Sequence, residues 1–244
     1  MNRSTAGLAG VATGAVLATG LLHAVPSVTT WRYLRVRATP GLAGIGRREH
    51  VALTFDDGPD PASTPEFLEA LDRLGWKATF FLLGSMTRRA PALAAELVAA
   101  GHEVGVHGDV HDSMLGRTPA QARDDIRRGF DTVAEASGAQ PRWFRPPYGV
   151  LSSGALLAAR DAGLRTVLWT AWGRDWRAEA TPLTVVGDVN RGLVPGATVL
   201  LHDSDCTSSP GSWRSALGAL PLLEELFASH GLTVGPLREH DVAA

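Results

Sequence analysis

From residue 50 onward, short apolar runs alternate with segments whose apolar side chains recur at helical spacing. In one such segment, Phe67, Leu68, Leu71 and Leu74 share a helix face, and Gly75 ends the pattern. Short apolar runs bounded by turn residues predict strands. The predicted strands are residues 50–55, 78–83, 103–106, 142–145, 165–169, 198–201 and 232–234. The predicted helices are residues 65–74, 91–100, 119–137, 154–162, 182–192 and 212–230.

Strands that alternate with helices imply a parallel sheet, either open and doubly wound or closed into a barrel. Polar residues follow nearly every predicted strand: Asp56 and Asp57, His107 and His111, Arg145, Asp175, and His202 and Asp203. An open sheet would gather such groups at one switch point, whereas a barrel carries them around its C-terminal rim. We therefore predict an α/β fold, a distorted (β/α)7 TIM-like barrel with its site at the C-terminal strand ends.

The N-terminal 30 residues have a different character, because no Lys, Arg, Asp or Glu lies between Arg3 and Arg32. This stretch predicts a signal peptide, with Ala18-Thr19-Gly20 as a small-residue cleavage site, or a membrane anchor, which needs about 20 residues. The arginines that follow it argue against simple export by the positive-inside rule. A leader without a targeting role is the remaining alternative.

The chain therefore divides into a leader at residues 1–30, a glycine-rich linker at 31–48 and a catalytic domain at 49–240. With the leader read as a signal or an anchor, we expect a protein that is secreted or membrane-anchored with the catalytic domain outside. Membrane contact would then be made through the N-terminal segment.

Composition narrows the functional classes. The chain has 244 residues, of which 45% are hydrophobic and 20% charged, so it can bury an ordered core. Its net charge is −2 and it has no dense basic block, which excludes nucleic acid as the expected partner. Cys206 is the single cysteine, so neither an internal disulfide nor a cysteine-based metal site is expected. We expect a monomer.

The apolar run 51–55 ends in Asp56 and Asp57, followed by Gly58-Pro59. Adjacent side chains of a strand point to opposite faces, but a bend at the strand end lets both carboxylates enter one pocket. Two such close carboxylates repel unless a cation or a proton lies between them. The pair therefore predicts a metal site, and its alternative role is to cap a turn.

His107 and His111 are four residues apart, so a helical turn would place both imidazoles on one side. With Asp57 as the third ligand they match a catalytic zinc site with one open position, and Asp56 remains free as a base. We expect one divalent ion, zinc, with cobalt as an alternative. The same ligand set can hold ferrous iron. If no metal binds, His107 and His111 are simply two histidines on a surface loop.

Two further charged groups fit such a site. Arg145 begins a stiff Arg-Pro-Pro turn, and its guanidinium can grip a carboxylate such as Asp56, or form a structural ion pair. His202 ends a buried strand and is either a satisfied core residue or a general acid. Asp175 can hold this imidazole and raise its pKa.

Five short motifs now carry a resemblance to a known family. They are Thr54-Phe55-Asp56-Asp57-Gly58-Pro59, His107-x-x-x-His111, Arg145-Pro146-Pro147-Tyr148-Gly149, Asp175-Trp176 and Leu200-Leu201-His202-Asp203. In this order they resemble the polysaccharide deacetylase family, which is carbohydrate esterase family 4 or the NodB homology domain. The resemblance covers residues 49–237 and implies a metal-dependent amide hydrolase that removes acetyl groups from N-acetylated sugar polymers or oligomers.

The resemblance also implies roles for individual residues. Asp57, His107 and His111 look like the metal ligands and Asp56 like the base. Arg145 would position that base.

By the same resemblance His202 would be the general acid, tuned by Asp175. The backbone N–H of Tyr148 would help to hold the oxyanion. Trp176 and Leu200 would form the apolar pocket for the acetyl methyl group.

One departure is Gly108, because the family has Ser or Thr after the first histidine to brace the metal-binding loop. Its absence puts the rigidity of that loop in doubt. Cys206 belongs to no family motif and is expected to be inert.

Other functions remain open. The chain can be an O-deacetylase, a hydrolase of a linear or cyclic non-sugar amide, or a catalytically inactive sugar-binding relative. The presence of a base, an acid and both of their partners argues against the last. Four tryptophans can stack on sugar faces or pack in the core, namely Trp143, Trp172, Trp176 and Trp213. Peptidoglycan, chitin fragments and a small N-acetyl sugar remain as substrates.

Overall fold

The computed structural model describes residues 20–243. Its strands are β1 (His50–Asp56), β2 (Thr79–Leu82), β3 (Glu103–Val106), β4 (Trp143–Phe144), β5 (Arg165–Thr166), β6 (Ala171–Trp172), β7 (Thr198–His202) and β8 (Thr233–Gly235). They form one sheet in the order β5-β4-β3-β2-β1-β7-β6, and every pairing is parallel. The first and last strands of this order, β5 and β6, are joined by residues 167–170, so the sheet curls back on itself. The predicted barrel-like α/β fold is confirmed.

The strand β1 lies at the centre of the sheet. It pairs with β7 along residues 52–56, with β2 along 54–56 and with β8 along 50–52. Because the β7 pairing overlaps both of the others, β7 must occupy one edge of β1, while β2 and β8 share the other. The end of β1 is thus held on both sides, which fixes the position of the residues that follow it.

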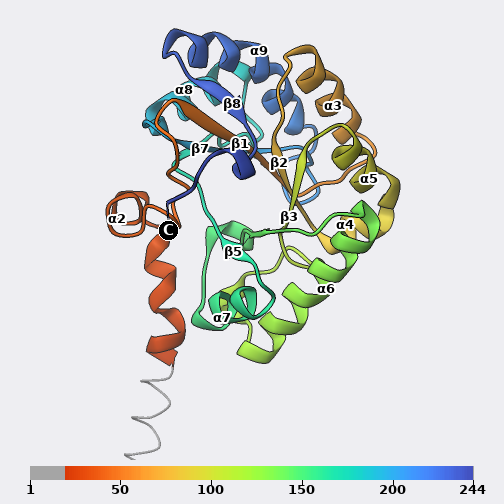
Figure 1. The fold of residues 1–244 in the computed structure, drawn as a ribbon, viewed down its shortest axis with the longest axis vertical. Helices are drawn as coiled ribbons and strands as arrows, with labels where there is room; N and C mark the ends of the chain where they lie inside the picture. The colour runs from red at the N-terminus through yellow and green to blue at the C-terminus, as the bar shows by residue number, and fades with distance from the viewer. Residues whose placement is uncertain (1–19, 244) are drawn as a thin grey trace, which may run out of the picture.

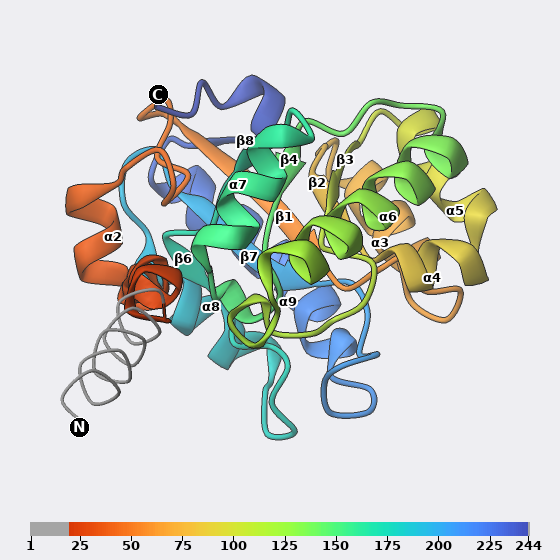
Figure 2. The ribbon, with the colours of Figure 1, turned by 90° about the horizontal axis from the view of Figure 1, so that it is seen from below.

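The helices surround the strands, as Figures 1 and 2 show. They are α2 (Arg32–Ala38), α3 (Thr64–Arg73), α4 (Gly84–Arg89), α5 (Pro91–Ala99), α6 (Pro119–Ser137), α7 (Ser153–Asp161), α8 (Pro182–Gly192) and α9 (Trp213–Ser229). Short 3₁₀ turns occur at Val25–Thr30, Met114–Gly116, Pro147–Gly149 and Leu237–Glu239.

Local sequence explains the ends of α6. Thr118 caps its N-terminus by accepting a hydrogen bond from the N–H of Gln121, whose side chain accepts from the N–H of Thr118 in return. Pro119 occupies the first helical position, and Gly138 ends the helix with φ 67°. The predicted capping box is confirmed.

The predicted strand 165–169 is wrong beyond residue 166, and neither β6 nor α4 was predicted. Leu168 leaves the strand direction because its N–H donates to the carbonyl of Leu42 at 2.7 Å, while the N–H of Thr170 donates to Thr198 O at 3.0 Å. Leu42 is far away in the sequence, so the apolar pattern of 165–169 carries no sign of this interruption.

Residues 31–48, predicted as a linker, form α2 and a turn that packs on the sheet. Arg35 and Ala43 are buried, and the hydroxyl of Thr198 donates to Gly44 O at 2.6 Å. Gly44 has φ 72°, and a Cβ there would lie 2.4 Å from the Thr198 hydroxyl. This glycine lets the turn approach β7 closely.

The predicted leader lies mostly outside the described residues, including Arg3 and the proposed cleavage site at Ala18-Thr19. Among the helices within residues 20–243, none combines the length and the apolar character needed to cross a bilayer.

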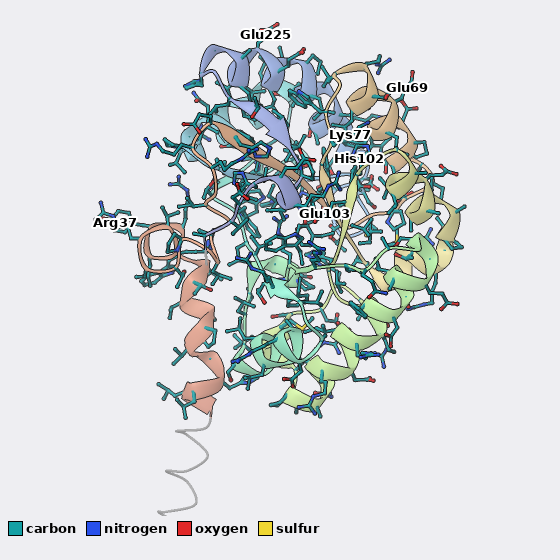
Figure 3. All side chains as sticks on the ribbon, in the orientation of Figure 1. Arg37, Glu69, Lys77, His102, Glu103 and Glu225 are labelled. Atoms are coloured by element: carbon teal, nitrogen blue, oxygen red, sulfur yellow. The ribbon has the colours of Figure 1, made fainter. Side chains whose placement is uncertain are left out.

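The main core lies between the sheet and the helices. Phe55 on β1 packs 5.1 Å from Phe67 and 4.9 Å from Phe80, between ring centroids. Each fully buried phenylalanine contributes about 1.5–3 kcal/mol. Figure 3 shows Glu103 among the strands, whereas Glu69 and Glu225 lie on outer helices. The buried Glu103 carboxylate accepts hydrogen bonds from Thr79 and from Trp143 Nε1, at 2.8 and 3.1 Å.

Candidate active site

Side-chain alternation along β1 decides where its two carboxylates point. Leu53 and Phe55 pack in the core under the helices, whereas Thr54 and Asp56 face the opposite side and meet Arg145. Asp57 has φ 81°, a left-handed conformation that is uncommon outside glycine. This bend turns Asp57 to the same side as Asp56, as the sequence predicted.

Arg145 orients Asp56. Its guanidinium donates to Asp56 Oδ1 at 2.7 Å, to the Thr54 hydroxyl at 2.8 Å and to Leu168 O at 2.9 Å. The side chain is fully buried, and Cζ lies 4.0 Å from the ring centroid of Phe81. The guanidinium therefore cannot rotate, and Asp56 Oδ1 is held by a charge-assisted hydrogen bond.

Asp57, His107 and His111 converge on one point. Asp57 Oδ1 lies 3.4 Å from Nε2 of both histidines, and no hydrogen-bond partner satisfies this buried oxygen within residues 20–243. His107 Nδ1 lies 2.7 Å from Arg145 O, and a carbonyl oxygen can only accept, so Nδ1 carries the proton. The unprotonated Nε2 then presents its lone pair toward Asp57. A divalent cation fits this donor set, which is two imidazoles and one carboxylate.

The electrostatics of the three groups agree with a cation at this point. Burial by itself would raise the pKa of Asp57, but the facing histidines hold this pKa well below its usual range. Burial lowers the pKa of His111 to about 4, so its imidazole is neutral and available as a ligand. Burial also opposes protonation of His107, but Asp56 and Asp57 together raise its pKa. The two carboxylates draw a positive charge, either a proton or a metal, into this position.

His202 is held by Asp175 through two contacts. Asp175 Oδ1 lies 2.9 Å from His202 Nδ1, and Oδ2 accepts the backbone N–H of His202 at 2.7 Å. Burial lowers the pKa of His202, but the buried Asp175 carboxylate outweighs this effect, and the pKa rises to about 10. The neighbouring Asp203 is not part of this pair, since its Oδ2 accepts from the Thr64 hydroxyl.

The carboxylates of Asp56 and Asp57 and the imidazoles of His107, His111 and His202 line one pocket of about 270 Å³. Its lining consists of Asp56, Asp57, His107, His111, Tyr148, Gly149, Trp169, Trp172, Trp176, Leu200, His202, Thr207 and Ser208. Tyr148, Trp176 and Leu200 thus line the same pocket as Asp56 and His202. Tyr148 has φ 59°, and no backbone carbonyl accepts its N–H within residues 20–243. Of the four candidate tryptophans, Trp143 and Trp213 are buried elsewhere.

The comparison with known families decides the membership of the chain. The family description "Polysaccharide deacetylase" matches residues 43–167. The chain belongs to this family. It is 37% identical over 170 residues to a chitooligosaccharide deacetylase of Bradyrhizobium sp. (strain ANU 289), covering 69% of this chain and 76% of that protein.

Two more proteins are similar to this chain. A peptidoglycan-N-acetylglucosamine deacetylase of Bacillus cereus is 37% identical over 155 residues, which are 63% of this chain and 72% of that protein. A solved structure of a family pseudoenzyme from Bacillus anthracis superimposes with a TM-score of 0.71 at 28% identity, covering 79% of this chain and 65% of that one.

The metal-binding loop of this polysaccharide deacetylase is braced without a hydroxyl at Gly108. Asp125, fully buried on α6, accepts the backbone N–H of Asp109 through Oδ1 at 3.0 Å. Gly108 has φ 99°, and a Cβ there would lie 2.8 Å from this same oxygen. The Asp125 carboxylate can therefore approach the loop this closely because residue 108 has no side chain. The sequence carries a sign of this role, because Asp125 is a charged residue on the same buried helix face as Ala122 and Ile126.

The loop after β7 supplies a contact that the motifs did not indicate. The Thr207 hydroxyl donates to Asp57 Oδ2 at 2.6 Å, which leaves Oδ1 to face the two histidines. The adjacent Cys206 thiol donates to Asp57 O at 3.6 Å. Burial, then the charge of Asp57, raises the pKa of Cys206 to about 12, so it stays a thiol and is a poor nucleophile.

Proposed function

We propose that this chain is a metal-dependent hydrolase that removes N-acetyl groups from N-acetylated sugars of the peptidoglycan or chitin type. The observation that carries the proposal is the pocket that brings together an Arg-held carboxylate, an Asp-held histidine and a three-ligand metal site. Such a pocket offers a proton acceptor, a proton donor and an electrophile, which amide hydrolysis requires.

Asp57, His107 and His111 would hold the metal, and zinc suits this donor set, with cobalt as an alternative. When bound, a divalent ion polarises the acetyl carbonyl and makes water more acidic.

The chain itself moves the protons. Asp56, held by Arg145, accepts the proton of the attacking water through its second oxygen. The Tyr148 backbone N–H stabilises the oxyanion that forms on the acetyl group. His202, kept protonated by Asp175, donates a proton to the sugar amine as it departs. Trp176 and Leu200 surround the acetyl methyl group.

A catalytically inactive role is less well supported, although a pseudoenzyme is among the similar structures. Here the acceptor Asp56 and the donor His202 line the same pocket, and each contacts its charged partner. An inactive sugar-binding protein has no need of either partner.

We also propose that the N-terminal segment takes the domain out of the cytosol, as a signal or a membrane anchor. Leu21, Leu22 and Trp31 expose 68, 70 and 74% of their surface, which suits contact with lipid. Fractionation of the native cell tests this, and full-length protein free in the cytosol would reject it.

Acetate release from a panel of compounds tests the proposed activity. The panel contains an N-acetylglucosamine tetramer, a peptidoglycan fragment, acetylated xylan and a small cyclic imide. Acetate should come from the N-acetylated sugars, stop after treatment with a chelator and return with zinc. Release from xylan alone, or turnover of the imide alone, would support the O-deacetylase or the non-sugar amidase instead.

A further inference from the structure

A second pocket lies against the catalytic pocket. Its volume is about 300 Å³, and it shares Trp169 and Trp172 with the catalytic pocket as a common wall. Its lining includes four arginines, which are Arg32, Arg35, Arg174 and Arg191. No residue of the polysaccharide deacetylase motifs is among them, so the proposed chemistry leaves this pocket without a role.

The positive charge of this pocket is largely uncompensated. Asp188 is the one carboxylate among the described residues that line it, and it already pairs with Arg191 and accepts from Arg177 at 2.8 Å. Within residues 20–243, neither Arg32 nor Arg174 has a carboxylate oxygen within 4.0 Å. A cluster of cations with so little local counter-charge attracts anions.

Arg35 shows the imbalance most clearly. It is only 3% exposed, and its guanidinium bonds carbonyl oxygens, including Trp169 O at 2.7 Å, rather than a carboxylate. Its Nε has no acceptor in the described part of the chain, and the same holds for Trp172 Nε1. Burial first, then repulsion from Arg145 and Arg32, lowers the pKa of Arg35 to about 10. Two buried N–H groups of residues that line the pocket thus lack an acceptor within residues 20–243.

Arg174 links this pocket to the catalytic residues. It directly precedes Asp175 and has φ 49°, an uncommon conformation for a side chain of this size. Its guanidinium lies 5.6 Å over the ring of Trp172, one of the two tryptophans shared by the pockets. An anion near Arg174 would therefore lie one side chain away from a sugar in the catalytic pocket.

We infer that the arginine pocket binds a carboxylate substituent of an acidic N-acetylated glycan while a neighbouring sugar loses its acetyl group. Guanidinium groups recognise carboxylates through paired hydrogen bonds, and the shared tryptophans offer faces for sugar rings. A neutral N-acetylglucosamine chain has no group to place there. The inference rests on the proposed function and narrows it, because it selects acidic peptidoglycan-type chains over neutral chitin-type chains.

Acetate-release kinetics on a matched pair of substrates test the inference. The pair is a neutral N-acetylglucosamine tetramer and a tetrasaccharide of peptidoglycan that carries lactyl carboxylates. The variants are Arg174→Gln and Arg174→Gln/Arg191→Gln in the full chain loaded with zinc. Arg160→Gln is the control, since Arg160 is exposed and lies outside both pockets.

The ratio of KM for the acidic substrate to KM for the neutral one should rise about tenfold in Arg174→Gln and further in the double variant, a loss typical of one charge-assisted contact. The ratio should not change in Arg160→Gln. Sodium chloride should raise it in the wild type, because salt screens the attraction.

The inference would be overturned if the KM ratio were unchanged in both variants. It would also be overturned if the variants lost only their affinity for vesicles that contain anionic lipid, measured in parallel. In either case acetate release from the neutral tetramer would leave the proposed function standing. If the wild type released acetate from neither substrate, the proposed function itself would fail.

Discussion

Asp56 and His202 face one pocket from different strands, and each is held by a partner of opposite charge. Asp56 accepts a hydrogen bond from Arg145 at 2.7 Å, and His202 meets Asp175 at 2.9 Å. The first pair keeps a carboxylate oxygen in place to accept a proton, and the second keeps an imidazole charged to donate one. The two roles, proton acceptance by Asp56 and proton donation by His202, can be distinguished experimentally by the choice of substrate.

Asp56→Asn and His202→Ala should each lower turnover of an N-acetyl sugar by about 10²–10⁴-fold, the usual scale for positioned proton transfer. Both should retain zinc, because neither residue belongs to the three-ligand set. On an aryl acetate, whose leaving group needs little protonation, His202→Ala should recover most of its activity while Asp56→Asn should not. Equal losses on both substrates in both variants would show that the roles are assigned wrongly.

Asp175→Asn should shift the alkaline limb of the pH profile. The Asp175 carboxylate raises the pKa of His202 to about 10, so its loss lowers that pKa. The donor then loses its proton at lower pH, and the alkaline limb of kcat should move to lower pH while activity at pH 6 falls only mildly. A profile with an unchanged alkaline limb would show that His202 does not set it.

At the scale of elements, α6 controls the metal-binding loop through Asp125. Asp125→Ala removes the oxygen that accepts the Asp109 N–H, whereas Asp125→Asn can retain an oxygen there. We expect Asp125→Ala to weaken zinc binding about 10–100-fold, as removal of an outer support of a metal site usually does. Asp125→Asn should lose less. Competition with a chromophoric chelator measures both.

Asp131→Ala is the matched control, because Asp131 lies on the same helix and pairs with Arg127 on the surface. If Asp125→Ala bound zinc as tightly as this control, Asp125 would support the helix rather than the loop.

Elements with a local signature could be predicted from the sequence, and those made by distant contacts could not. The α6 boundaries follow from Thr118, Pro119 and Gly138, which lie within the helix ends. The split between β5 and β6 depends on Leu42, more than a hundred residues earlier. The site shows the same division. The three metal ligands lie in recognisable spacings, whereas the Thr207–Asp57 contact exists only after β1 and β7 have paired.

At the scale of the whole molecule, the two ends of the domain close the N-terminal side of the sheet. His240, near the C-terminus, contacts His50 at the start of β1, with 2.7 Å between the Nδ1 atoms. His240 Nε2 lies 3.0 and 3.2 Å from the carbonyl oxygens of Gly196 and Gly44. His240 therefore donates through Nε2, and its Nδ1 accepts from His50. This hydrogen bond requires His240 to be neutral, because a protonated His240 would have no nitrogen left to accept from His50.

The same pair makes the stability of the domain sensitive to acid. Burial lowers the pKa of His50 to about 4 and also lowers that of His240, whereas an unfolded histidine titrates near about 6.5. Between about pH 6.5 and pH 4, these two histidines bind protons in the unfolded chain but not in the folded chain. The stabilisation is therefore complete above pH 6.5 and is lost as the pH falls toward 4.

We expect the unfolding free energy of the wild type to fall by about 2–3 kcal/mol between pH 7 and pH 4.5 from His50 alone. His50→Gln can still donate to His240 but cannot titrate, so its stability should depend less steeply on pH. Urea unfolding at a series of pH values measures the slope. His230→Gln, at an exposed histidine beyond α9, should keep the wild-type slope. If His50→Gln kept that slope as well, the acid sensitivity would have to come from other groups, and the closure of the domain by its two ends would not depend on the protonation of this pair.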